Sequence, residues 1–155
     1  MSSSIATPHV TLRPAVSEDL AAVEQLLVAS SLPVIGVAEA LPSFVVAESD
    51  GQLVGVVGLE ICCEYALLRS TAVAPEWRDR GLGRQLVERI IAEAEAQGIC
   101  ALYLLTTTAE RYFPSFGFAK TTRDAVPAPV QQTAEFQSAC PASATVMCLT
   151  LPSAH

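Results

Sequence analysis

A short stretch rich in arginine and glycine, Arg78-Asp79-Arg80-Gly81-Leu82-Gly83-Arg84, separates two runs of different periodicity. Residues 67–74 form an apolar, β-branched run that predicts a strand, and residues 85–97 have the spacing of a helix. The first N–H groups of a helix have no partner inside it, and the peptide dipoles add about half a positive charge there. The glycines allow close approach of a phosphate, and the arginines supply matching donors. The sequence therefore predicts a phosphate-binding site, here called the anion site, between a strand and a helix.

The overall charge restricts what this site can bind. The chain carries a formal net charge of -7, so it lacks the broad positive surface that nucleic acids require. A local basic cluster in such a chain predicts a small anion as its partner, and the alternative is a solvated turn rich in arginine. The length of 155 residues and the 51% hydrophobic content predict one domain over residues 1–155, with loose ends at 1–8 and 152–155.

Signals for membranes and secretion are not found in the sequence. No apolar run reaches the roughly 20 residues of a membrane-spanning helix, and the first residues lack the basic start of a signal peptide. Five cysteines, an odd number, fit reduced thiols better than a disulfide framework. The pair Cys62-Cys63 lacks C-x-x-C spacing, so we expect buried thiols rather than soft-metal ligands, and no metal site. These features predict a cytoplasmic protein without a membrane partner.

The remaining patterns predict a mixed α/β domain. Strands are expected at residues 9–14, 43–48, 52–62, 65–74, 100–106, 119–123 and 144–151, and helices at residues 18–30, 82–97 and 109–116. Ser17 is expected to cap the first helix. The unit from residue 65 to residue 106 predicts a right-handed crossover between parallel strands. Gly55 and Gly58 indicate a bulge or a close backbone approach.

Two further segments have no regular pattern. Residues 32–36 form an apolar loop that either lines a substrate site or fills space under the sheet. Residues 125–140 contain prolines and predict a flap with one or two helical turns. We expect this flap to close over a ligand.

The anion site and a second motif resemble those of the GNAT acetyltransferase superfamily. Residues 78–83 fit its Q/R-x-x-G-x-G/A pattern, and Tyr112-Phe113-Pro114-Ser115-Phe116-Gly117-Phe118 looks like its aromatic-x-x-x-G-F segment. The resemblance implies an α/β fold whose mixed sheet splays open between the strands at residues 65 and 100. It also implies acetyl-CoA as cosubstrate in the gap, with no metal.

The same resemblance implies which residues hold the cosubstrate. The backbone of Thr71, Ala72 and Val73 would pair with the pantetheine arm like an added strand. The pyrophosphate would lie on the anion site, and Thr107 and Phe113 would lie beside the cosubstrate.

Narrower resemblances concern the acceptor. Four segments look like GNAT proteins encoded with arsenic-resistance genes, namely residues 67–70, 103–109, 123–127 and 136–141. The leucine-threonine run and the G-F segment also resemble the acetyltransferase domain of N-acetylglutamate synthases. Both imply a small amino-acid-like acceptor acetylated on its amine, including an arsenic-containing toxic analogue. Such relatives often form homodimers.

The chemistry of acetyl transfer requires a base, a polarising donor and a route for the leaving thiolate. The resemblance implies direct attack in a ternary complex, with a backbone N–H near Val73 polarising the thioester carbonyl. Glu64 is the first candidate base and Glu60 the second, and the alternative for both is surface charge. Many GNAT enzymes have a tyrosine acid where this chain has Phe113. Tyr112 is therefore the candidate acid, and water is the alternative.

An amino-acid acceptor also needs a partner for its carboxylate. Arg69 lies in an apolar strand, where an arginine either binds a carboxylate or forms a structural ion pair. Arg123 is a second candidate, Thr106 is placed to donate a hydrogen bond, and Cys140 is expected in the wall of the flap.

Two other functions are compatible with these motifs. One is a protein or peptide N-acetyltransferase, which an acidic groove would favour and a closed pocket under the flap would disfavour. The other is a non-catalytic sensor that binds acyl-CoA or arsenite through thiols.

Overall fold

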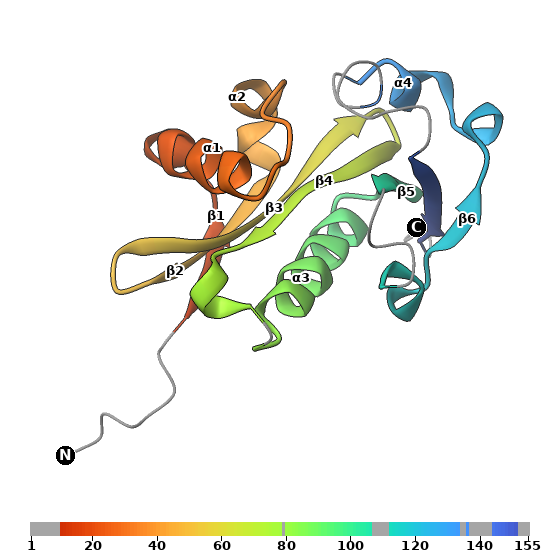
Figure 1. The fold of residues 1–155 in the computed structure, drawn as a ribbon. Coiled ribbons are helices and arrows are strands. Elements are labelled where there is room, and N and C mark those ends of the chain that lie inside the picture. The colour runs from red at the N-terminus through yellow and green to blue at the C-terminus, as the bar shows by residue number, and fades with distance from the viewer. Residues whose placement is uncertain (1–9, 79, 107–111, 134–135, 137–143, 152–155) are drawn as a thin grey trace.

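The computed structural model describes residues 10–78, 80–106, 112–133, 136 and 144–151. Seven strands form one sheet in the order β1-β2-β3-β4-β5-β7-β6 (Figure 1). The strands are β1 (Thr11–Pro14), β2 (Phe44–Ser49), β3 (Gln52–Cys62), β4 (Tyr65–Val73), β5 (Ala101–Thr106), β6 (Ala119–Thr121) and β7 (Thr145–Thr150). The helices are α1 (Leu20–Ala29), α2 (Val37–Ala40), α3 (Leu82–Ala96) and α4 (Ala128–Gln131). The predicted mixed α/β class is confirmed.

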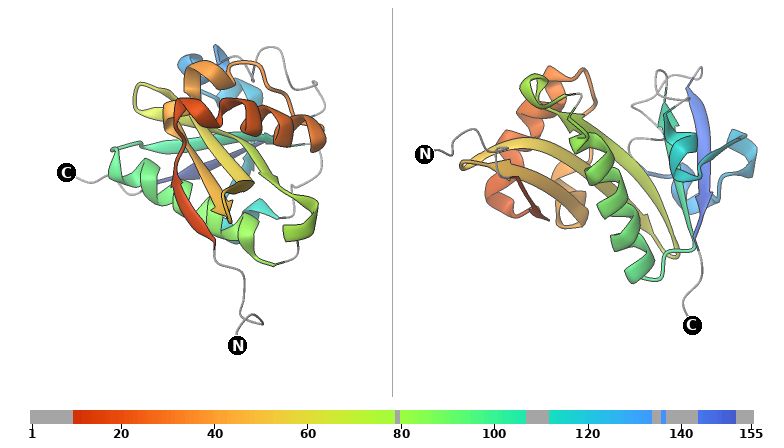
Figure 2. Two further views of the ribbon diagram at one scale, coloured as in Figure 1. Left: turned by 90° about the vertical axis from the view of Figure 1, so that its left-hand side faces the viewer. Right: turned by 90° about the horizontal axis from the view of Figure 1, so that it is seen from below.

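The sheet separates two layers of helices. Helix α3 packs on one face, and α1 and α2 pack on the other (Figure 2). The buried residues of α3 recur at helical spacing, which is why this segment forms a helix with one apolar side; they are Leu82, Leu86, Val87, Ile90 and Ala94. No described helix is both long and apolar enough to cross a membrane.

Most of the predicted strands end within two residues of the expected position, but two local predictions differ. The helix expected at residues 109–116 is described only as a 3₁₀ turn, Phe113–Phe116. The prediction that Ser17 caps α1 is wrong. The carboxylate of Asp19 instead accepts the Val16 N–H at 2.8 Å and is held by the Arg13 guanidinium at 2.8 and 3.0 Å. This hydrogen bond from Arg13 lowers the pKa of Asp19.

Strand β4 contains a β-bulge at its centre. Gly58 pairs with Arg69 and Val56 pairs with Ala72, so one residue of β3 faces two residues of β4. One of these two, Ser70, has a φ of 62°. Ala66 and Leu68 pack under α3, whereas Ala72 packs under α1. The bulge therefore exchanges the faces to which alternate side chains of β4 point.

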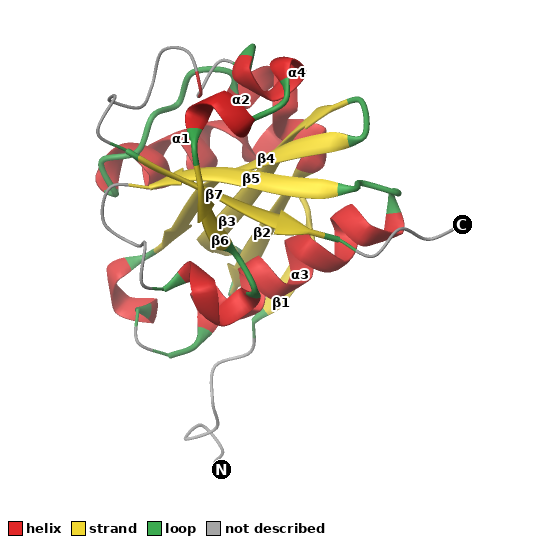
Figure 3. Cartoon of the chain, turned by 90° about the vertical axis from the view of Figure 1, so that its right-hand side faces the viewer, coloured by secondary structure: helices red, strands yellow, loops and turns green. Residues whose placement is uncertain are grey.

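The two central strands separate soon after they begin. Strands β4 and β5 are parallel and pair at only three positions, Tyr65 with Ala101, Ala66 with Leu102 and Leu67 with Tyr103. Strand β5 then continues beside β7, which carries β6 on its other edge (Figure 3). Figure 2 shows the resulting divergence of β1–β4 from β5, β7 and β6. The splayed sheet implied by the sequence motifs is confirmed.

Gly58 faces the ring of Phe44, which is 1% exposed. A Cβ at Gly58 would overlap three atoms of this ring, which confirms the predicted close approach. We expect Gly58→Ala to lower the free energy of unfolding by about 1–3 kcal/mol, because a buried ring has little room to move. Urea denaturation measures the effect. Gly83→Ala is the control, since the nearest atoms to a Cβ there lie at 3.7 Å, and equal midpoints for the two variants would contradict the prediction.

Candidate functional site

The start of α3 has the geometry of an anion site. Gly81 precedes the helix with a φ of 82°, and the first helical hydrogen bond runs from Gln85 N–H to the Gly81 carbonyl at 3.1 Å. Among the described residues no side chain caps this terminus, and its first turn contains no acidic residue. The N–H groups of the first turn are therefore available to a ligand.

Three arginines surround this helix start, and all three are exposed. Arg78 Nε donates to the Val73 carbonyl at 3.1 Å, and the Arg80 guanidinium lies 5.2 Å from the Trp77 ring centre. Arg84 Nη2 donates to Ser115 Oγ at 2.8 Å. These contacts keep positive charge beside the helix start. Asp79 lies outside the described residues.

Tyr112 and Phe113 point in different directions. Phe113 is buried in the core under α3, so the aromatic ring at the usual tyrosine position faces the interior. The Tyr112 ring packs edge-on against Phe113 at 5.3 Å, and its hydroxyl lies 3.7 Å from where a Cβ of Gly83 would be. A tyrosine hydroxyl is protonated at neutral pH, and burial raises the pKa of Tyr112 further above that range. The hydroxyl therefore lies near the anion site and is able to donate a hydrogen bond there.

The segment Thr71 to Val73 lies on the part of β4 that has left β5. Ala72 is buried under α1, and the hydroxyl of Thr71 is buried without a hydrogen-bond partner among the described residues. Buried polar groups are normally satisfied by protein, water or ligand. This orphaned hydroxyl fits a segment that receives a ligand bearing polar groups.

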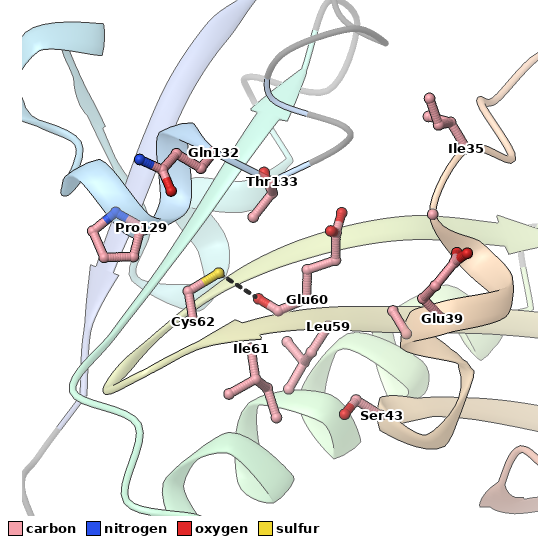
Figure 4. Close-up of a pocket in the computed structure, with 12 residues that line it drawn as sticks. Ile35, Glu39, Ser43, Leu59, Glu60, Ile61, Cys62, Pro129, Gln132 and Thr133 are labelled. Carbon is pink, nitrogen blue, oxygen red and sulfur yellow. Dashed lines mark hydrogen bonds between the residues drawn. The ribbon is translucent and has the colours of Figure 1, made fainter.

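A pocket of about 590 Å³ lies between α2, β3 and the α4 segment (Figure 4). We call it the acceptor pocket, after the role that we propose for it. It is lined by Ile35, Gly36, Glu39, Ala40, Ser43, Leu59, Glu60, Ile61, Cys62, Pro129, Gln132 and Thr133. The apolar loop at residues 32–36 thus forms one wall, and the proline-containing flap forms another.

Glu60 and Arg69 connect this pocket to the bulge. Glu60 Oε1 pairs with Arg69 Nη1 at 2.8 Å, and Arg69 Nε donates to Ser70 Oγ at 2.9 Å. Arg69 Nη2 also donates to the Pro33 carbonyl at 3.3 Å. The side chain of Arg69 has no exposed surface, and that of Glu60 is 14% exposed. The structure thus gives Arg69 a structural ion pair, and its binding of a substrate carboxylate stays a prediction.

The other predicted residues lie apart from this pair. Glu64 is exposed in the turn between β3 and β4, at the end where β4 and β5 are joined, and it does not line the pocket. Thr106 ends β5 opposite Thr145, and the Arg123 guanidinium lies 5.3 Å from the Phe136 ring centre. Thr107 and Cys140 lie outside the described residues.

Comparison with known proteins decides the family. A family model described as Acetyltransferase (GNAT) domain matches residues 40–120. The chain belongs to the GNAT acetyltransferase family. Amino-acid acetyltransferase of Pseudomonas fluorescens (strain Pf0-1) is similar to this GNAT domain, with 33% identity over 90 residues. These residues are 57% of this chain and 21% of the relative, so the chain spans about a fifth of the length of the curated relatives it matches.

Solved GNAT structures share the fold. N-acetylglutamate synthase from Neisseria gonorrhoeae, complexed with coenzyme A and N-acetyl-glutamate, has a TM-score of 0.79 and 22% identity, over 95% of this chain and 36% of that chain. Rv2747 from Mycobacterium tuberculosis, in complex with CoA, has a TM-score of 0.77 and 23% identity, over 92% of this chain and 99% of that one.

The second charged residue of the pocket in this GNAT domain was not predicted from the sequence. Glu39 lies in α2 and lines the acceptor pocket. It is the single charged residue between Glu24 and Glu48. A lone charge in a long apolar stretch is the signal that points to it.

Proposed function

We propose that the chain is an acetyl-CoA-dependent N-acetyltransferase for the amine of a small amino acid or amino-acid analogue. The carrying observation is the position of the anion site, which follows the free end of β4 where the strand has separated from β5. The coenzyme A in the solved GNAT structures and the amino-acid acetyltransferase relatives support this function. Acetyl-CoA would supply the acetyl thioester.

The described residues fit this cosubstrate. The free N–H groups of α3 and the three arginines would bind the pyrophosphate, with Gly83 allowing close approach. The backbone at Thr71, Ala72 and Val73 would pair with the amide-bearing arm, and the orphaned Thr71 hydroxyl offers it a hydrogen bond. Phe113 would support the cosubstrate site indirectly, because its buried ring packs in the core beneath the start of α3.

The acceptor amine would enter the acceptor pocket and lose a proton there. Glu60 is better placed than Glu64 to take this proton, because Glu60 lines the pocket and its Oε2 accepts no hydrogen bond from the described residues. A backbone N–H near Val73 would polarise the carbonyl. Tyr112 is the group proposed to help the thiolate leave.

The proposal also covers the transfer mechanism, the contacts of the acceptor and the assembly of the protein. The acetyl group would pass directly from acetyl-CoA to the amine, in a complex holding both substrates. The predicted contacts of the acceptor stay Arg69, Thr106, Arg123 and Cys140. The predicted contact of the cosubstrate stays Thr107. An arsenic-containing amino-acid analogue belongs in the acceptor panel, and a homodimer is the predicted assembly.

The function is tested by measuring CoA release with a thiol reagent across a panel of amino acids. Release that depends on an acceptor is the expected result. Tight binding of acetyl-CoA without release for any acceptor would favour a non-catalytic acyl-CoA sensor.

The anion site is tested by Arg84→Gln. We expect the Kd for acetyl-CoA to rise by about ten- to a hundredfold, because a charge-assisted hydrogen bond to phosphate contributes about 1.5–3 kcal/mol. Calorimetry measures the Kd, and binding of S-acetylpantetheine, which lacks the pyrophosphate, should not change.

Arg89→Gln is the matched control for this substitution. Arg89 lies on the same helix and pairs with Glu93 at 3.0 Å. Equal Kd values for the Arg84 and Arg89 variants would contradict the placement of the pyrophosphate.

A further inference from the structure

The acceptor pocket contains two carboxylates in different electrostatic settings. Figure 4 shows Glu39 and Glu60 on the same side of β3, facing the space between Ile35 and Thr133. Glu60 is neutralised by the ion pair with Arg69. Glu39 is exposed and forms no ion pair or hydrogen bond with the described residues. Among the described residues that line the pocket, Glu39 therefore carries a negative charge without a partner.

Apart from Arg69, each arginine that the structure describes contacts a group other than the residues that line the pocket. Arg13 pairs with Asp19 and Glu48 on another part of the surface, and Arg89 pairs with Glu93. Three more arginines surround the anion site, and Arg123 stacks on Phe136. The sequence contains no lysine or arginine after Arg123, so residues 124–155 add no such charge to the flap. None of the described residues that line the pocket is a lysine or arginine.

An unpaired carboxylate in a pocket discriminates between acceptors by the sign of their side-chain charge. A cation beside Glu39 would gain Coulomb energy, and a carboxylate there would be repelled. A volume of about 590 Å³ is large enough for an amino acid of the size of arginine. The arrangement does not suit a second acidic group on the acceptor.

We infer that the acceptor is an amino acid with a cationic side chain, and that Glu39 selects it by pairing with that cation. This inference rests on the proposed function, and it narrows the substrate class to basic rather than dicarboxylic amino acids. Glu39 acts on affinity for the acceptor and does not touch the reacting nitrogen. The two carboxylates thus have different roles: Glu60 takes the proton of the acceptor amine, and Glu39 determines which acceptor binds.

The experiment compares acceptors that have nearly the same shape but different charge. Comparing arginine with citrulline tests whether Glu39 attracts a cationic side chain. Comparing glutamate with glutamine tests whether Glu39 repels an anionic side chain. We expect kcat/KM for arginine to exceed that for citrulline by roughly three- to tenfold, as for a half-exposed ion pair, and glutamate to be used less well than glutamine. Glu39→Gln should bring both ratios towards one, and Glu39→Lys should reverse them.

Glu95→Gln is the matched control, because Glu95 lies on α3, on the opposite face of the sheet. This variant should keep both ratios. A ratio for arginine and citrulline that is the same in the wild type and in Glu39→Lys would overturn the inference. If no acceptor releases CoA, the proposed function fails, and Kd values for the same four acceptors, measured by calorimetry with CoA present, then decide the inference by the same ratios.

Discussion

Glu60→Gln is expected to lower kcat by about 10²- to 10⁴-fold, the range for loss of a general base. The substitution keeps the size of the side chain and a hydrogen-bond acceptor for Arg69, which lies 2.8 Å from Glu60 Oε1. It removes the group that lines the acceptor pocket and is able to take a proton. The Kd for acetyl-CoA should not change, because the anion site lies at the start of α3. CoA release and calorimetry measure the two quantities.

Glu64→Gln distinguishes between the two candidate bases. Glu64 is exposed in the turn that joins β3 to β4, so we expect at most a small effect on kcat. A large loss in Glu64→Gln together with a small loss in Glu60→Gln would contradict our assignment. In that case the turn residue, favoured by the sequence motifs, would be the base.

Arg69→Met is expected to lower the free energy of unfolding by about 3–5 kcal/mol. The Arg69 side chain has no exposed surface, so its loss leaves the mostly buried Glu60 carboxylate without a partner. It also removes donors to Ser70 Oγ and to the Pro33 carbonyl. Urea denaturation measures the change. In the double variant Arg69→Met with Glu60→Met, part of the stability should return, because no buried charge then remains unpaired.

Arg89→Met is the control for this prediction. Its ion pair with Glu93 spans one turn of α3, and both side chains are about one third exposed, at 33% and 37%. A pair of this kind contributes about 0.3–0.5 kcal/mol. If Arg69→Met costs no more than Arg89→Met, the buried network does not hold the pocket and the bulge together.

The features that depend on local sequence were predicted well. Helix α3 is specified by the spacing of its apolar residues, and its start follows Gly81, as the glycines of the sequence predicted. The parallel pairing of β4 with β5 follows from the long helical connection between them, which returns the chain to the same end of the sheet. In each case the physical cause lies within a short stretch of chain.

The features that depend on contacts between distant segments were not predicted in detail. The ion pair of Arg69 with Glu60 depends on the register of β3 with β4, which is shifted by the bulge at Ser70. Ser17 does not cap α1, and the nearby Asp19 carboxylate is held by Arg13 of β1, a contact between distant elements. The place of Glu39 in the pocket depends on α2 and the α4 segment lining the same space, although about 90 residues separate them. The spacing of apolar residues along the sequence contains no information about contacts between distant segments.

The short pairing of β4 with β5 has a consequence for association between molecules. Beyond Leu67 and Tyr103 the facing edges of these strands form no ladder with each other. Unpaired edges of this kind attract extended segments of other chains and promote aggregation. A cosubstrate arm lying along β4 would occupy one of these edges, so we expect the ligand-bound protein to be less prone to aggregate than the free protein. Cosubstrate supply would then protect the fold as well as support catalysis.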